Sequence, residues 1–394
     1  MAANVLTYNA IGTILNQIVT QATGKAVITP TNTSEFVAVA QTGLLAGYDN
    51  LMGAISQVLS RTVISTRPYS RKFQGLEADN IRYGNHVRKL NYKDRQWEDG
   101  SRLPLTTGVT VDDQAPTLDE VLQTNFYGQN DYEIPWTLFS NQLDVAFSSP
   151  DELGAFITGK LQNISDMTEQ KHESMARMIL CNLIAGVISI NNAPQIVHLL
   201  TEYNTYSGYS PAKTLTDIRG DADEYEKFVK WIYGRVAAIS AMLTERSIIY
   251  HQNVTDKEIS RHTPYDMQNV YLFSGERFQM EASALSDIYH DNYLRMADTA
   301  ILNFWQSITT PDTIEVTPTY MDVDGSLVTP ESEVEQANVF GVITDVEAAG
   351  YTIVNQRTTS AAYNGKGEFQ NFWLKFTDRY WNDFTENTVV MLLD

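Results

Sequence analysis

Apolar residues recur at helical spacing near the start of the chain. Within residues 1–24 and again within 34–59 they lie three or four positions apart, which predicts two helical stretches joined by a polar loop. Gly24 is expected to end the first stretch, and Ser34 is expected to cap the second. Three glycines weaken the second stretch, so we expect it to be interrupted.

A much longer helix is predicted after Ser149. Ser149 and Glu152 occupy the N-cap and capping-box positions around a first-turn proline, and apolar residues then recur at helical spacing as far as Gly186. A helix of this length forms a rod of about 50 Å. Another well-defined helix is predicted to start at Asp221, which forms a capping pair with Glu224.

Two parts of the chain have the pattern of strands. In residues 65–134, short mixed segments separated by glycines predict an extended hairpin with little core of its own. The end of the chain is β-rich, with a turn at residues 364–367. The strands predicted after residue 260 are NVYLF, ILNFWQSITT, DTIEVTP, VFGVITDVEAAGYTIVNQ, FWLKFTDRYW and TVVMLLD.

Composition narrows the class of protein. The chain has 394 residues, of which 43% are hydrophobic, so it can bury a sizeable core. Its 28 Lys and Arg against 48 Asp and Glu give a net charge of −20, which disfavours sequence-independent binding of nucleic acid. The single cysteine, Cys181, excludes a disulfide framework and is expected to be buried on the long helix. No secretory pattern and no apolar run of ~20 residues is visible, so we expect no membrane partner.

The charge is unevenly distributed along the chain. Residues 61–102 hold ten Lys and Arg against five Asp and Glu, a net +5, so the rest of the chain carries −25. A nucleic-acid-binding arm would need uninterrupted positive charge. A basic extension that lies on the acidic body of an identical neighbour fits this distribution better. An ordinary solvated hairpin is the plainer alternative.

Patterns of catalytic or ligand-binding residues are missing from the sequence. The six histidines are scattered without the spacing of a helical zinc site, and His172 on the long helix is expected to face solvent. The segment 321–325 resembles the start of a calcium loop but lacks the third acid and the closing glutamate, so a polar turn is predicted. We therefore expect no enzyme activity, no catalytic, cofactor-binding or metal-binding residues, and no cofactor.

Three segments together carry a resemblance to a known family. They are GYDNLMGAISQVLSRTVISTRPYSRKFQGL, NFYGQNDYEIPWTLFSNQLDVAFSSPDELGAFITGKLQN and FWLKFTDRYWNDFTENTVVMLLD. In this order they look like a helical arm running into an extended loop, the loop returning into a long capped helix, and a set of closing strands. The chain thus resembles the major capsid proteins of tailed bacteriophages, with the Hong Kong 97-type fold, and is most similar to those of phi-29-like short-tailed phages.

The resemblance implies an α+β fold with a particular division of the chain. It places an N-terminal arm in residues 1–64 and an extended loop in 65–134. A peripheral domain with the long spine helix would span 135–188 and be completed by returning strands in 341–394, and an axial domain would span 189–340. These boundaries are expectations carried over from the family.

The resemblance also implies a function and partners. The chain would assemble with itself into pentamers and hexamers of an icosahedral or elongated shell, which encloses packaged double-stranded DNA without binding it specifically. A separate scaffolding protein and a portal are implied, with assembly in the cytoplasm of the bacterial host and a final location in the virion. An encapsulin-like compartment and an intracellular acidic hydrolase are the alternatives. Basic residues of the extended loop are expected to form ion pairs between subunits: Arg82, Arg88, Lys89, Lys93 and Arg95.

Overall fold

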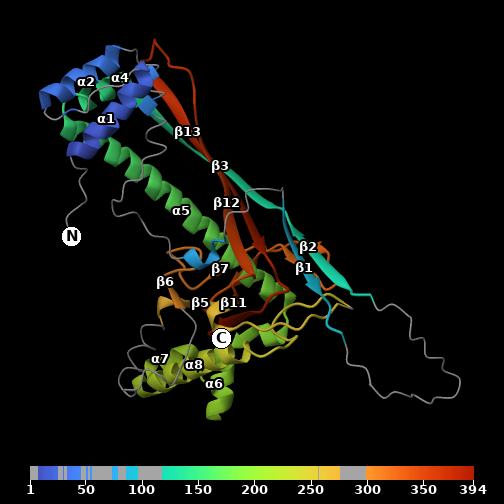
Figure 1. Cartoon of the computed structure of the whole chain (residues 1–394). Helices are drawn as coiled ribbons and strands as arrows, with labels where there is room; N and C mark the ends of the chain where they lie inside the picture. The colour runs from blue at the N-terminus through green and yellow to red at the C-terminus, as the bar shows by residue number, and fades with distance from the viewer. Residues whose placement is uncertain are drawn as a thin grey trace.

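The computed structural model describes most of the chain after residue 118 and shorter pieces before it. The described residues are 8–24, 30, 33–45, 50–51, 54–55, 73–78, 86–95, 118–255, 257–275 and 299–394. Figure 1 shows a small helical cluster at one end and a larger body at the other, connected by one long helix and a narrow three-stranded sheet.

The helical cluster forms one hydrophobic core at the far end of the long helix. It contains α1 (Tyr8–Thr23), α2 (Thr33–Leu45) and α4 (Ser140–Ala146), which pack on the start of α5 (Pro150–Ile190). Gly24 adopts a left-handed backbone with φ of 70°, as expected for a residue that ends a helix. The second helix begins at residue 33, so Ser34 lies in its first turn rather than before it. The largest buried side chains of this core are Leu15, Ile18, Phe36, Leu51, Ile55 and Phe372.

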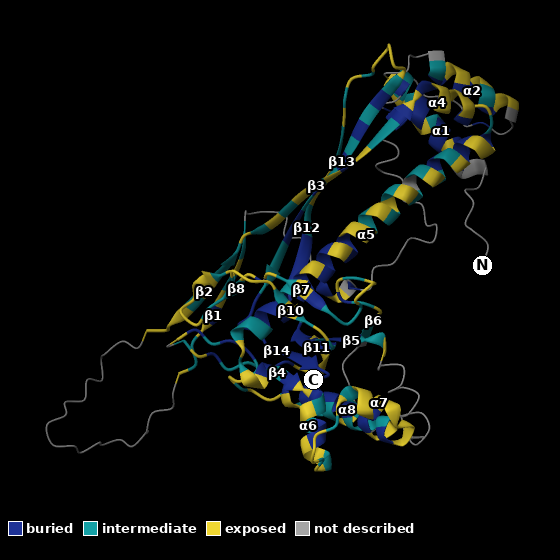
Figure 2. Cartoon of the chain, turned by 180° about the vertical axis from the view of Figure 1, so that it is seen from behind, coloured by how far each residue is buried: buried dark blue, intermediate teal, exposed yellow. Residues whose placement is uncertain are grey.

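The long helix α5 connects the two ends of the molecule (Figure 1). It has 41 residues and begins as predicted, with the Ser149 side chain accepting a hydrogen bond of 3.2 Å from the backbone N–H of Glu152. Between residues 158 and 171 its described side chains are exposed or half-buried, whereas both ends are largely buried. The helix therefore links two separate cores, with its middle turns in contact with solvent (Figure 2).

Beside α5 runs a long three-stranded antiparallel sheet. Its strand order is β12 (Ala349–Ser360), β13 (Phe369–Asn382) and β3 (Gly128–Phe139). Side chains on β13 alternate between buried and half-buried, because one face lies toward α5 and the other toward solvent. The edge strand β3 contains Pro135, which cannot donate a backbone hydrogen bond and is tolerated at a sheet edge.

The larger body is built on a five-stranded sheet with helices on both faces. One face packs on the end of α5, and the other packs on α6, α7 and α8 (Figure 1). Because both faces are covered, every residue of β11 and β14 is buried. The strand order is β4 (Ile196–His198), β14 (Thr388–Leu392), β11 (Val339–Asp345), β5 (Gln268–Phe273) and β6 (Thr299–Leu302), and the helices are α6 (Leu199–Ser207), α7 (Leu215–Gly220) and α8 (Ala222–Met242).

Short elements complete the described fold. A hairpin, β1 (Val87–Tyr92) with β2 (Val121–Phe126), projects from the body, and its further course at residues 96–117 lies outside the described residues. The remaining elements are η1 (Gln74–Leu76), η2 (Ala193–Gln195), η3 (Tyr265–Met267), and two small antiparallel pairs, β7 (Ile314–Val316) with β10 (Val334–Gln336) and β8 (Tyr320–Met321) with β9 (Leu327–Val328).

Two predicted element boundaries are wrong. Helix α5 does not end at Gly186 but continues to Ile190, because Gly186 serves close packing: a Cβ there would lie 2.4 Å from the ring of Phe384. The predicted strand ILNFWQSITT is a strand only as far as residue 302. The chain then turns, and the indole of Trp305 enters the core and donates a 2.7 Å hydrogen bond to the carbonyl of Val339.

The expected division into arm, loop and two domains stays a prediction. The final segment 341–394 contributes to both sheets. Its strands β12 and β13 belong to the long sheet, whereas β14 and the part of β11 after residue 340 belong to the five-stranded sheet. Residues 106–113 (TTGVTVDD), part of the predicted extended loop, lie outside the described residues.

Helix α5 is also the one described helix that is long and apolar enough to cross a membrane, which the sequence reading did not expect. However, 67% of its most apolar stretch is buried inside the protein. The helix has the environment of a core helix in a folded domain, because the five-stranded sheet and the long sheet cover that stretch.

Candidate functional site: the anchored extended hairpin

The residues predicted to contact neighbouring subunits gather on or beside the projecting hairpin. Arg88 and Lys89 lie on β1, which pairs with β2 in antiparallel register so that Lys89 is opposite Thr124. Lys93 and Arg95 follow directly after β1, and Arg82 lies outside the described residues. Consecutive strand residues point to opposite faces, so Arg88 and Lys89 have different surroundings.

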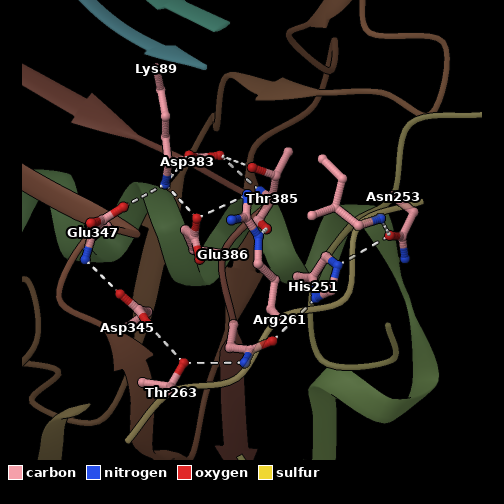
Figure 3. A network of polar contacts seen from close by, with 12 residues as sticks. Lys89, His251, Asn253, Arg261, Thr263, Asp345, Glu347, Asp383, Thr385 and Glu386 are labelled. Atoms are coloured by element: carbon pink, nitrogen blue, oxygen red, sulfur yellow. Dashed lines mark hydrogen bonds and ion pairs between the residues drawn. The ribbon is translucent and has the colours of Figure 1, made fainter. Parts of the chain in front are cut away.

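Lys89 points toward the body of its own chain and meets three carboxylates (Figure 3). Its Nζ lies 3.0 Å from Asp383 Oδ2 and 3.0 Å from Glu347 Oε2, and it donates a short hydrogen bond to Glu386. Glu347 belongs to the turn between β11 and β12, and Asp383 and Glu386 belong to the connection between β13 and β14. One lysine thus connects the hairpin to the two turns through which the long sheet joins the five-stranded sheet.

The electrostatics of this contact favour a charged lysine. Burial by itself lowers the pKa of Lys89, but the charges of Asp383 and Glu386 outweigh burial and raise the pKa above its ordinary value of 10.5. Burial raises the pKa of Glu386 to about 7, although the charges of Lys89 and Arg261 oppose that rise. Lys89 is therefore protonated at all ordinary pH values, and Glu386 becomes ionised above about pH 7.

The contact continues into a buried polar network behind Lys89 (Figure 3). Arg261 lies 3.0 Å from Glu386 and donates a 3.1 Å hydrogen bond to the carbonyl of Thr385. Thr385 in turn donates to Asp383 through both its backbone N–H, at 2.9 Å, and its hydroxyl, at 2.6 Å. Asp383, Thr385 and Glu386 are all buried, and their contacts with one another and with Arg261 hold this connection in place beside Lys89.

Lys93, Asp94 and Arg95 form a second, more exposed group. They lie just beyond the last β1–β2 pair, at the end of the stem where the chain continues into residues 96–117. Lys93 pairs with Glu120 at 3.2 Å and Arg95 pairs with Asp119, so both pairs close the hairpin stem. Asp94 instead contacts the body: it pairs with Arg246 and accepts a 2.7 Å hydrogen bond from the backbone N–H of Ser260. Burial opposes ionisation of Asp94, but the Ser260 hydrogen bond and the Arg246 charge lower its pKa below the ordinary value.

The opposite face of the hairpin points away from the body and carries three exposed apolar side chains beside Arg88 and the amides Gln123 and Asn125. Leu90, Tyr92 and Val121 are 46%, 61% and 40% exposed. Leu90 lies opposite Gln123 and Tyr92 lies opposite Val121 in the register, so these side chains share one face with Arg88. Arg88 is exposed, and no described residue forms an ion pair or hydrogen bond with it. Exposed apolar side chains mixed with a cation and amides are compatible with a protein contact surface.

The structure also shows the environment of three other features singled out in the sequence, namely His172, Cys181 and the segment 321–325. His172 was expected to face solvent, and this is wrong: it is 2% exposed, it lies 2.9 Å from the hydroxyl of Tyr132, and it sits 3.6 Å from the buried Asp378. Helix α5 turns this side toward the long sheet.

Cys181 is buried as predicted, and burial raises the pKa of its thiol to about 12.

The segment 321–325 is a polar turn between β8 and β9, as predicted. Asp322 and Asp324 accept hydrogen bonds from backbone N–H groups of Val323 and Ser326, at 2.7 and 2.8 Å, and so serve the turn itself. Among the residues that the structure describes, no group of three or more His, Cys, Asp or Glu side chains could hold a metal ion.

Sequence reasoning missed the acidic partners of Lys89. Asp383 and Glu386 lie in a short polar segment between two strands, which is a turn signal and nothing more. Lys89 and Glu386 are 297 positions apart, and no local pattern relates two residues at that separation. The excess of positive charge in residues 61–102 was the one available signal, and it did not distinguish a partner in the same chain from a partner in another copy.

Comparison with known proteins adds independent information. The family model described as Phi29-like phage major capsid protein matches residues 15–392. A search of curated proteins finds no match. A chain from the capsid structure of Staphylococcus phage Andhra is similar, with a TM-score of 0.56 and 10% identity over 84% of this chain and 87% of that chain. A chain from the structure of the head fiber and inner core protein of native bacteriophage P68 gives a TM-score of 0.54, also with 10% identity and the same coverage.

The comparisons agree with the order of elements along the chain. At 10% identity the two structures establish the fold, and the family match covers nearly the whole sequence. Neither the encapsulin-like compartment nor the acidic hydrolase is favoured by these matches. The chain therefore belongs to the family of Phi29-like phage major capsid proteins and is a structural protein of the virion shell.

Proposed function

We propose that the chain assembles with itself into pentamers and hexamers through the outward face of its extended hairpin. The observation that carries this proposal is the division of β1 into two faces. Lys89 holds the inner face on its own chain, while Leu90 and Tyr92 are exposed on the outer face beside Arg88. A hairpin whose inner face is fixed and whose outer face exposes Leu90, Tyr92 and Val121 can bind a neighbour with little loss of conformational entropy.

In this arrangement the four described basic residues of the predicted set have different roles. Arg88 is the candidate for an ion pair between subunits, because it lies on the outer face without a described partner. Lys93 and Arg95 support the hairpin stem, and their exposed pairs each contribute only ~0–1 kcal/mol. The apolar side chains would supply most of the contact free energy, at roughly 25 cal/mol for each Å² that is buried. Many such weak contacts add up around a closed shell.

We further propose that the shell encloses double-stranded DNA without binding it specifically, and that a separate scaffolding protein and a portal take part in assembly. The net charge of −20 supports the first part, because an acidic surface repels a polyanion. A building block of this kind needs no catalytic residues, so we also propose that the chain has no enzyme activity.

Electron microscopy of the purified chain tests the proposal. Wild-type protein should form closed shells, or rings of five and six, and a stable monomer that turns over a substrate would contradict it. Leu90→Asp should prevent assembly while leaving the circular dichroism of the monomer unchanged, because Leu90 is already exposed there. Leu327→Asp is the matched control, since Leu327 is 79% exposed on a different hairpin. Normal shells from Leu90→Asp would refute the role given to the outer face.

A further inference from the structure

A second contact surface lies on the long sheet, away from the hairpin. On the face of β3, β12 and β13 that points away from α5, a groove of about 360 Å³ opens around the irregularity in β12 between Ile353 and Asn355. Buried side chains such as Leu374 and Phe376 alternate with the charged residues of this face. The lining residues are Asp131, Tyr132, Glu133, Asn355, Arg357, Lys375, Phe376 and Thr377.

Two charges in this groove repel each other and so lower the stability of the isolated folded chain. Arg357 and Lys375 are direct cross-strand partners in the β12–β13 register and line the same groove, so two positive charges face each other. Like charges in this position destabilise a sheet. Glu133 pairs with Lys375 at 3.4 Å, and Asp131 is occupied by hydrogen bonds from Thr377 and Gln129.

Arg357 is therefore the cation of the groove that lacks a described partner. It is exposed, and no described residue forms an ion pair or hydrogen bond with it. Its guanidinium can bind a carboxylate through two parallel hydrogen bonds, which a lysine cannot do. A polyanion such as DNA fits the groove less well than one carboxylate, because Asp131 and Glu133 lie beside the two cations.

We propose that this groove binds a carboxylate side chain from a second copy of this chain, with Arg357 as its main contact. The charge balance supports the identity of the partner, since each copy offers 48 Asp and Glu residues against 28 Lys and Arg. The inference rests on the proposed self-assembly, but it concerns a different surface from the outer face of the hairpin.

Reversing the charge of Arg357 should have opposite effects on the stability of the folded chain and on its assembly. Arg357→Glu replaces a repulsive cross-strand pair with an attractive one, so the folding equilibrium constant of the unassembled chain should rise about two- to fivefold in urea titrations. The same variant should assemble poorly, with the protein concentration needed for shells raised by about tenfold or more. Lys366→Glu is the matched control, because it makes the same charge change at an exposed turn outside the groove.

Cross-linking identifies the partner directly. Shells assembled from equal amounts of ¹⁴N- and ¹⁵N-labelled chains are treated with a carbodiimide, which joins lysine to a carboxylate in contact with it. Lys375 also links to Glu133 of its own chain, and those peptides carry a single isotope. Links from Lys375 to any other acidic residue should include peptide pairs with both isotopes, and the absence of such mixed pairs would overturn the proposal.

The controls separate the possible failures. If the wild type forms neither shells nor rings of five and six, the proposed function fails. If Arg357→Glu forms shells at the same concentration as the wild type, the groove inference alone fails. If the wild type binds a short DNA duplex and Arg357→Glu does not, the partner is a nucleic acid and the assignment to a second copy is wrong.

Discussion

Replacement of Lys89 by methionine should release the extended hairpin from the body of the chain. Methionine has a similar length and keeps the apolar contacts of the stem, so the change removes chiefly the charge. Asp383, at 2% exposure, then loses its ion-pair partner, and Glu386 keeps only Arg261. Removing one partner of a buried ion pair typically costs ~3–5 kcal/mol. Lys89 is itself 18% exposed, so a value near the lower end, about 3 kcal/mol, is expected.

Amide hydrogen exchange of the unassembled chain measures this loss of stability directly in the hairpin strands β1 and β2. A two-stranded hairpin is only marginally stable by itself, so protection of the amides in β1 and β2 depends on the contact with the body. A loss of about 3 kcal/mol corresponds to roughly 100-fold faster exchange, since ~1.4 kcal/mol is a factor of ten. The core strands β11 and β14 should change much less, because they are buried independently of the hairpin.

Lys93→Met provides the matched comparison. It removes a lysine four positions away whose partner, Glu120, is 60% exposed, so the expected cost is ~0–1 kcal/mol. Exchange rates in β1 that differ by less than about threefold between Lys89→Met and the wild type would refute the anchoring role. Equal effects of the two variants would show that burial of the Lys89 contact has no energetic importance.

Three further predictions concern α5 and the pH dependence of the anchor. Ser149→Ala should lower the free energy of unfolding by ~1 kcal/mol in urea titrations, because the side-chain cap of α5 is lost. Gly186→Val should destabilise the chain by ~1–3 kcal/mol, because the new side chain collides with the ring of Phe384, whereas Gly159→Ala on an open helix face should be neutral or stabilising. The pKa of Lys89 is higher in the folded chain than the ordinary 10.5, so its stabilising contribution is complete below pH 10.5 and is lost as the pH rises above it. The difference in melting temperature between wild type and Lys89→Met should therefore be smaller at pH 12 than at pH 10, and a difference of the same size at both values would contradict the assignment.

Local signals in the sequence were sufficient wherever a short stretch determines its own structure. The N-cap at Ser149, the left-handed stop at Gly24 and the capping residue Asp221 all appear as predicted, because each depends on backbone groups within a few residues. The β-rich end and the extended hairpin were predicted for the same reason, since strand patterns and turn residues are local. The family resemblance followed from the order of these elements.

Tertiary packing decided the features that local patterns left open. His172 on the long helix was predicted to face solvent, yet it is buried because the long sheet lies against that turn of α5. Gly186 was interpreted as a helix stop, whereas the structure uses its missing side chain to admit Phe384. In both cases the deciding contact comes from a distant part of the chain.

The sequence by itself determined that this chain is an acidic α+β protein with a long capped helix and a basic, hairpin-like extension, since composition and periodicity are properties of the chain alone. Only the tertiary structure decided what that basic charge contacts. Folding brings Glu386 to Lys89 across 297 positions of sequence, together with Asp383, and turns Leu90 and Tyr92 outward. Alternation along a strand forces adjacent residues to opposite faces, so anchoring and exposure arise from the same six residues of β1.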